Sequence, residues 1–151
     1  MNSTTPFVVL LVEDEPADAH LVKVALRENR LLVDLHTACD GVEALQFLRH
    51  QDRYAQADSP VPRPDLILLD LNMPRMDGRE FLSVIKEDPA LADIPVVVLT
   101  TSDVERDVIA SYHLRAAGFI TKPVDIEQFS QAIRSLGDYW FSLVRLPGRG
   151  A

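Results

Sequence analysis

Leu66-Ile67-Leu68-Leu69-Asp70 is a run of four large aliphatic residues that ends in a carboxylate. A continuous apolar run, without the alternation of a half-exposed strand, is typical of a strand buried on both faces of a parallel sheet. Phe7–Val12 and Val96–Leu99 have the same character, and both are followed by polar residues. Weaker runs at Leu31–Leu35 and Gly118–Thr121 bring the expected number of strands to five.

Amphipathic stretches with helical spacing lie between the expected strands. Apolar residues recur every three or four positions in three of them, at Ala17, Leu21, Val24 and Ala25, at Val42, Leu45 and Leu48, and at Ile126, Phe129, Ile133 and Leu136. Asp40-Gly41-Val42-Glu43 matches the sequence pattern of a capping box, which predicts that a helix begins here. The alternation of strands and helices predicts an α/β fold, a doubly wound five-stranded parallel sheet with helices on both faces.

Length and composition limit the kinds of protein that the chain can be. With 151 residues and 47% hydrophobic content, it is expected to form one globular domain. The net charge of −8 and the lack of any lysine-arginine run argue against nucleic-acid binding. Phe7–Val12 is too short to span a membrane or to serve as a signal-peptide core, and the lone Cys39 cannot form an internal disulfide. The sequence therefore favours a cytoplasmic protein with no membrane partner.

Polar side chains follow four of the expected strands, at the point where each strand ends. Glu13-Asp14-Glu15 follows the first strand, Asp70 ends the third, Thr100-Thr101-Ser102 follows the fourth and Lys122-Pro123 the fifth. In a parallel doubly wound sheet, ligands bind beyond the carboxyl ends of the strands, so these side chains are expected to meet there. Carboxylates crowded at one place repel each other, and a hard divalent cation between them offsets this repulsion. Mg²⁺ prefers such oxygen ligands. Asp14 and Asp70 are the expected carboxylate ligands.

The same cluster has the parts of a phosphoryl-transfer site. A carboxylate beside a cation can attack phosphorus and form an aspartyl phosphate, and Asp70 at the tip of the central strand has that position. The transferred group carries dispersed negative charge, which an ammonium and a hydroxyl donor would stabilise. Lys122 and Thr100 suit these roles.

Five motifs together resemble the receiver domain of two-component response regulators, over roughly residues 7–136. They are Leu11-Val12-Glu13-Asp14, Leu68-Leu69-Asp70-Leu71-Asn72-Met73-Pro74, Asp77-Gly78, Val98-Leu99-Thr100 and Thr121-Lys122-Pro123. The resemblance implies strand order 2-1-3-4-5 and makes Asp70 the phosphoacceptor. It also implies an Mg²⁺ site formed by Glu13, Asp14, Asp70 and the main-chain carbonyl of Asn72.

The resemblance further implies a switch that reports phosphorylation. Thr100 would be the switch hydroxyl, Lys122 the phosphate-binding lysine, and Phe119 the aromatic residue that turns inwards when Thr100 moves. The Lys122–Pro123 bond is commonly cis in such domains. The output face would be formed by the fourth helix, the strand at Gly118–Thr121 and the last helix.

The C-terminal stretch is longer than the receiver pattern requires. Residues 1–6 are expected to form an N-terminal arm, 7–136 the receiver domain, and 137–151 an extension of the last helix with a tail. Leu136, Trp140 and Val144 continue the apolar stripe of that helix, which could fold onto its own domain. Alternatively the region near Trp140 and exposed parts of the output face, such as Tyr112, could form a homodimer.

The extension, together with Arg79-Glu80-Phe81-Leu82 and the stretch from Pro95 to Ser102, is similar to small response regulators paired with bacterial and cyanobacterial phytochrome histidine kinases. The leading hypothesis is therefore a single-domain response regulator, possessing no enzymatic output, that receives its phosphoryl group from such a sensor kinase docked near the first helix. The signal would leave through a downstream protein, dimerisation or a second phosphocarrier.

Two other classes of function remain open at this point. Phosphatases of the haloacid-dehalogenase type also use a strand-end aspartate, but they place a second aspartate two residues later, where this chain has Asn72. A phosphate-independent binding module with the same fold is the other alternative. The intact set of Asp14, Asp70, Thr100 and Lys122 stands against it.

Overall fold

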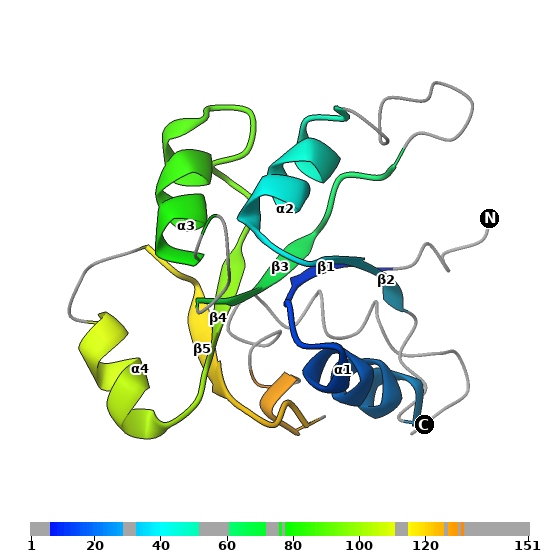
Figure 1. Ribbon diagram of the computed structural model, residues 1–151, viewed down its shortest axis with the longest axis vertical. Coiled ribbons are helices and arrows are strands. Elements are labelled where there is room, and N and C mark those ends of the chain that lie inside the picture. The colour runs from blue at the N-terminus through cyan, green and yellow to red at the C-terminus, as the bar shows by residue number, and fades with distance from the viewer. Residues whose placement is uncertain are drawn as a thin grey trace.

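One parallel sheet forms the centre of the molecule (Figure 1). The computed structural model describes residues 7–28, 33–51, 61–71, 76, 78–110, 115–125, 127–129 and 131. The strands are β1 (Phe7–Val12), β2 (Val33–Ala38), β3 (Leu66–Asp70), β4 (Val96–Thr100) and β5 (Gly118–Thr121). Their order is β2-β1-β3-β4-β5, and every pairing is parallel, as predicted. The helices in the described ranges are α1 (Pro16–Glu28), α2 (Gly41–Leu48), α3 (Gly78–Glu87) and α4 (Asp103–Ala110).

Helices cover both faces of the sheet, which explains the continuous apolar strands. Figure 1 shows α2 and α3 on one face and α1 on the other. Phe47, Phe81 and Ile85 pack with one set of strand side chains, and Val22 and Phe129 pack with the alternating set. All residues of β3 and β4 are buried, since both faces of these strands lie under helices.

The second strand differs from its predicted range. β2 extends to Ala38, whereas the apolar run ended at Leu35. β2 pairs only with β1 and lies at the sheet edge, where Asp34 and His36 stay partly exposed. An edge strand does not need a continuous apolar run, so the hydrophobic pattern underestimated its length.

The predicted capping box at the start of α2 is confirmed. Asp40 is the N-cap, and its Oδ1 accepts a hydrogen bond from the Glu43 amide at 2.9 Å. In a capping box the glutamate side chain is expected to accept a hydrogen bond from the amide of the N-cap residue, here Asp40. Glu43 Oε1 instead accepts from the amide of the preceding residue, Cys39, at 2.7 Å.

Several predictions fall outside the described residues. These are the arm at 1–6, the 137–151 extension with Trp140, and the exposed position of Tyr112. Of the expected last helix, the structure describes residues 127–129 and 131, which are helical. In the part of the chain that is described, no helix combines the length and apolar content needed to cross a membrane.

Candidate functional site

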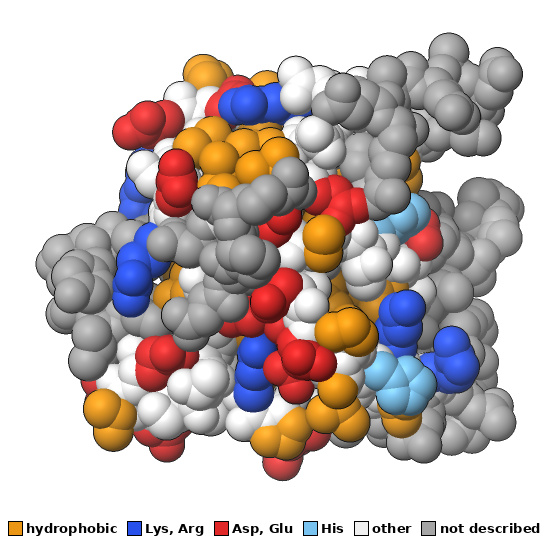
Figure 2. Space-filling model, in the orientation of Figure 1, with side chains coloured by type: hydrophobic (Ala, Val, Ile, Leu, Met, Phe, Trp, Pro, Cys, Tyr) orange, Lys and Arg blue, Asp and Glu red, His pale blue; other side chains and the backbone are white. Residues whose placement is uncertain are grey.

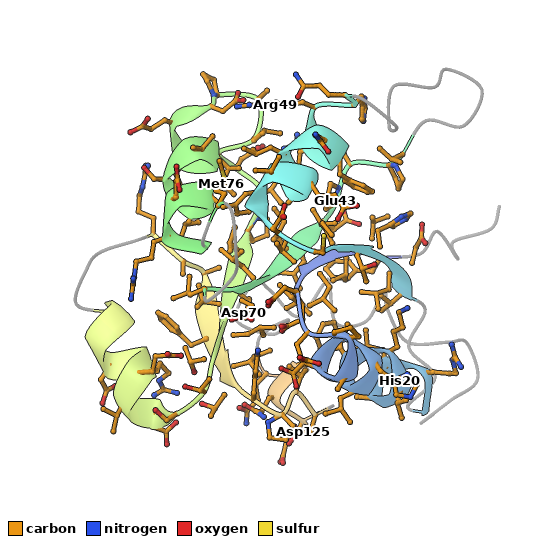
Figure 3. The ribbon with its side chains drawn as sticks, in the orientation of Figure 1. His20, Glu43, Arg49, Asp70, Met76 and Asp125 are labelled. Atoms are coloured by element: carbon orange, nitrogen blue, oxygen red, sulfur yellow. The ribbon has the colours of Figure 1, made fainter. Side chains whose placement is uncertain are left out.

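Adjacent strands bring the acidic side chains together at one edge of the sheet. Val12 pairs with Leu69 in the β1–β3 register, so the next residues, Glu13 and Asp70, lie side by side. One carboxylate oxygen from each of Glu13, Asp14 and Asp70 lies within 4.8 Å of the others. Figure 3 shows Asp70 at the end of β3, near the middle of the face turned toward the viewer. The predicted meeting of these three acids is thus observed.

Two of these carboxylates are buried and contact a lysine. Glu13 and Asp70 are only 6% and 4% exposed, whereas Asp14 is open to solvent. Lys122 Nζ lies 3.0 Å from Glu13 Oε1 and 3.2 Å from Asp70 Oδ2. Figure 2 shows acidic side chains near the middle of this face with a cationic side chain beside them. The lysine therefore offsets part of the repulsion among the acids.

Burial and charge change the proton affinities of this cluster. Burial raises the pKa of Glu13 to about 7, and hydrogen bonding and repulsion from Asp70 add to the rise, while Lys122 opposes it. Burial would lower the pKa of Lys122, but hydrogen bonding to Glu13 and the charges of Asp70 and Glu13 outweigh it, so that this pKa lies above its usual value. Lys122 therefore stays cationic at neutral pH, whereas Glu13 is poised to exchange a proton.

The acid cluster fits a divalent cation. Glu13 Oε1 is buried, and the Lys122 ammonium 3.0 Å away is shared with Asp70, so one positive charge faces two buried carboxylates. Buried negative charge that is only partly offset is costly, and a divalent cation is a suitable further partner for it. The donors in the cluster are all carboxylate oxygens, which suit a hard cation and not a soft one.

Metal binding at this cluster is expected to depend on pH around neutrality. Because the pKa of Glu13 is about 7, this carboxyl holds a proton at lower pH that a cation must displace. The apparent affinity for Mn²⁺ should therefore fall as pH drops below about 7, with proton release on binding. Titration calorimetry in buffers of different ionisation heat measures both effects. An affinity that stays constant between about pH 5.5 and 7.5 would contradict the raised pKa, since an ordinary glutamate is already ionised there.

The remaining predicted site residues occupy the ends of β4 and β5. Thr100 is fully buried, and its hydroxyl lies 3.5 Å from the Ile120 carbonyl oxygen as donor, so it contacts β5. Phe119 is half-buried and packs against the core on the α2–α3 face. The Lys122–Pro123 peptide bond is cis, as the resemblance implied. Asn72, the expected source of a main-chain carbonyl ligand, lies outside the described residues.

One contact of the site was missed in the sequence. Asp18 Oδ2 lies 3.1 Å from Lys122 Nζ, although the two residues are 104 positions apart. Asp18 lies in the first turn of α1, where an acidic residue is ordinarily explained by the helix dipole. The only available signal was its position two residues after Pro16, which opens the helix that follows the acidic loop.

The site is accessible from solution. A cleft of about 430 Å³ adjoins the acid cluster, and Glu13, Asp14, His20, Lys23 and Glu43 are among the residues that line it. The cleft lies between α1 and the start of α2, so a solute can reach the exposed Asp14 from this side.

Comparison with known proteins identifies relatives over nearly the whole chain. The family described as "Response regulator receiver domain" matches residues 9–134. The chain is 44% identical over 146 residues to response regulator Rcp1 of Synechocystis sp., which covers 97% of each chain.

Two solved structures share both sequence and fold with the chain. The Mn²⁺-bound form of response regulator Rcp1 is 45% identical with a TM-score of 0.70, and the match covers 95% of this chain and 100% of that one. The phosphorylated cyanobacterial phytochrome response regulator RcpA is 43% identical with a TM-score of 0.71, and the match has the same coverage.

Proposed function

Since this chain belongs to the family of response regulator receiver domains, we propose that Asp70 accepts a phosphoryl group from a sensor histidine kinase. In this step the N–P bond of the kinase phosphohistidine breaks and an O–P bond to Asp70 forms. The imidazole leaves with the electron pair of the broken bond and takes up a proton. The chain then signals by changing shape.

The observation that carries this proposal is the buried pairing of Asp70 with Lys122 at 3.2 Å. The ammonium stands beside the carboxylate nucleophile, where it can attract an incoming phosphoryl oxygen. The similarity to RcpA, whose structure is described as phosphorylated, supports the same chemistry here.

We propose Mg²⁺ as the cation of this site. Glu13, Asp14 and Asp70 would hold it through carboxylate oxygens, together with the main-chain carbonyl of Asn72. When bound, the cation neutralises the crowded acids and stabilises negative charge on the transferring group. The Mn²⁺-bound structure of Rcp1 supports a divalent cation, and the oxygen-only donor set favours Mg²⁺.

The proposed switch starts from Thr100. Its hydroxyl now lies 3.5 Å from the Ile120 carbonyl oxygen, and we propose that it leaves this contact to donate to a phosphoryl oxygen on Asp70. Phe119 neighbours Ile120 on β5, so a shift of Thr100 would leave space into which the Phe119 ring could turn. The equilibrium between the two arrangements would then depend on phosphorylation.

Replacing Thr100 with alanine is expected to separate phosphorylation from signalling. The variant should still take up phosphoryl, several-fold more slowly because one oxygen loses its donor. The NMR signals of the Phe119 ring should shift on phosphorylation of the wild-type chain but not of Thr100→Ala. Thr101→Ala removes a neighbouring hydroxyl and serves as the control. An equal Phe119 shift in Thr100→Ala would contradict the proposed switch.

The proposed partners follow from the relatives. RcpA is a phytochrome response regulator, so a phytochrome histidine kinase is the proposed phosphodonor, docking near α1. Output would pass through α4, β5 and the last helix to a downstream protein or a second phosphocarrier. The region near Trp140 is the proposed contact of a homodimer. Response regulator receivers are signalling proteins, and we propose that this chain turns over no external substrate.

Phosphotransfer from kinases tests the proposed function. A radiolabelled phytochrome-type histidine kinase, mixed with the chain and Mg²⁺, should lose its label to the chain within minutes, whereas unrelated histidine kinases should transfer far more slowly. The transferred label should be removed by hydroxylamine, as expected of an acyl phosphate. Failure of every kinase and of small acyl phosphate donors to label the chain would overturn the proposal.

A further inference from the structure

Lys122 has three carboxylate neighbours, and they come from two different parts of the fold. Glu13 and Asp70 approach its Nζ from the strand ends, at 3.0 and 3.2 Å. Asp18 approaches from the first turn of α1, at 3.1 Å. The ammonium therefore bridges α1 to the strand that carries the proposed phosphoacceptor.

Asp18 differs from the other two acids in what else it can bind. Glu13 and Asp70 belong to the cluster that fits a divalent cation, and Asp18 does not. The side chain of Asp18 is 37% exposed, against 1% for Glu13 and 6% for Asp70. Of the three acids, only Asp18 thus stays available to the lysine when the strand-end carboxylates are engaged elsewhere.

We infer that Asp18 is a positioning residue for phosphoryl transfer, holding the Lys122 ammonium beside Asp70 while Glu13 and Asp70 bind other groups. This inference rests on the proposed function of Asp70. Helix α1 would then contribute to phosphoryl transfer through Asp18, in addition to the residues of the acidic loop and the strand ends.

The need for such an anchor follows from the lysine side chain. Lysine has a flexible four-carbon stem, and an ammonium that loses its carboxylate partners gains many rotamers in which it no longer faces Asp70. Positioning of a charged group contributes to the rate only if the group is already in place when the phosphoryl group arrives.

The surroundings of the ion pair make Asp18 an effective anchor. Asp18 and Lys122 line a small cavity together with Val22, Leu99 and Val124. These apolar side chains limit water around the Lys122 end of the pair, whereas 37% of the Asp18 side chain stays exposed. The 16% exposure of the Lys122 side chain agrees with this shielding.

Asp18→Asn keeps the shape of the side chain and removes its charge. With a small phosphoramidate or acyl phosphate donor and saturating Mg²⁺, the maximal rate of phosphorylation should fall about three- to tenfold. Asp18→Glu, which keeps the charge, should recover part of that rate. Asp107→Asn removes the same charge from an exposed position on α4, away from the cluster, and should leave the rate unchanged.

A double-mutant cycle separates positioning from a structural role. If Asp18 acts through Lys122, then Asp18→Asn should cause no further loss of rate in a Lys122→Gln background. Mn²⁺ affinity, measured by calorimetry, should be nearly the same in Asp18→Asn as in the wild type. An equal loss of rate in both backgrounds, or no loss in either, would overturn the inference.

A readout without metal completes the test. In the metal-free chain, urea unfolding of the same four proteins should show a favourable coupling between Asp18 and Lys122. Absence of this coupling would contradict the anchor even if the rates changed. If the wild-type chain is not phosphorylated at all, the proposed function fails. If it is, and Asp18→Asn is phosphorylated at the wild-type rate, only the present inference fails.

Discussion

Asp70→Asn is expected to abolish phosphoryl uptake while leaving the fold in place. The amide has nearly the same shape as the carboxylate but is not a nucleophile toward phosphorus, so uptake should fall by about 100-fold or more. Asp70 is 4% exposed and pairs with Lys122 at 3.2 Å, so the neutral amide also leaves fewer negative charges around the ammonium. Intact-mass analysis after incubation with a small donor and Mg²⁺ measures the uptake.

The control for this variant is Asp107→Asn, an exposed carboxylate on α4. It removes the same charge far from the strand ends and should be phosphorylated like the wild type. Circular dichroism and urea unfolding should show that Asp70→Asn is folded. Undiminished uptake by folded Asp70→Asn would mean that another residue is the acceptor.

Gly78→Ala is expected to cause a large loss of stability, because there is no room for a side chain where α3 begins. A Cβ at this position would lie 2.5 Å from the Leu71 Cα and 2.7 Å from the Asp70 carbonyl oxygen. Backbone atoms cannot rotate away as a side chain can, so the loop between β3 and α3 must move. We expect the free energy of unfolding to fall by about 3 kcal/mol, measured in urea.

Two other glycines provide matched controls. Among the described residues, a Cβ at Gly118 would meet just Val97 Cγ2, at 3.9 Å, which is an ordinary contact, so Gly118→Ala should be neutral or slightly stabilising. At Gly41 the close neighbour is the Met76 side chain at 2.8 Å, which can shift, so an intermediate loss is expected. Equal stability of Gly78→Ala and Gly118→Ala would contradict the close approach at Gly78.

Gly78→Ala should also impair the site, because its steric conflict involves Asp70 itself. The Gly78 amide donates to the Leu71 carbonyl oxygen at 3.0 Å and so ties the start of α3 to the residue after Asp70. Phosphorylation of the folded fraction should therefore be slower than in Gly118→Ala.

Much of the fold was predictable from the sequence because the central strands are buried on both faces. The residues of the runs at Leu66–Leu69 and Val96–Leu99 are all buried, so their composition alone identifies them. β2 was harder, because an edge strand tolerates Asp34 and His36 and its length is set by pairing with β1. The hydrophobic pattern of a sequence does not show which strands pair, so it could not predict the length of β2.

The candidate site was predictable where it depends on strand ends and not where it depends on helix orientation. The proximity of Glu13, Asp14, Asp70 and Lys122 follows from parallel strands whose carboxyl ends meet. The contact of Asp18 with Lys122 depends on how the first turn of α1 is oriented toward the residue that follows β5. That orientation is set by tertiary contacts, which no local motif specifies.

Identification of the phosphorylated residue shows whether Asp70 is the phosphoacceptor. Borohydride reduction of the phosphorylated chain converts an aspartyl phosphate to homoserine, and peptide mass spectrometry then gives its position. We expect homoserine at position 70 and unmodified Asp14 and Asp18. Homoserine at another position, or a phosphoryl group that resists both borohydride and hydroxylamine, would contradict this expectation.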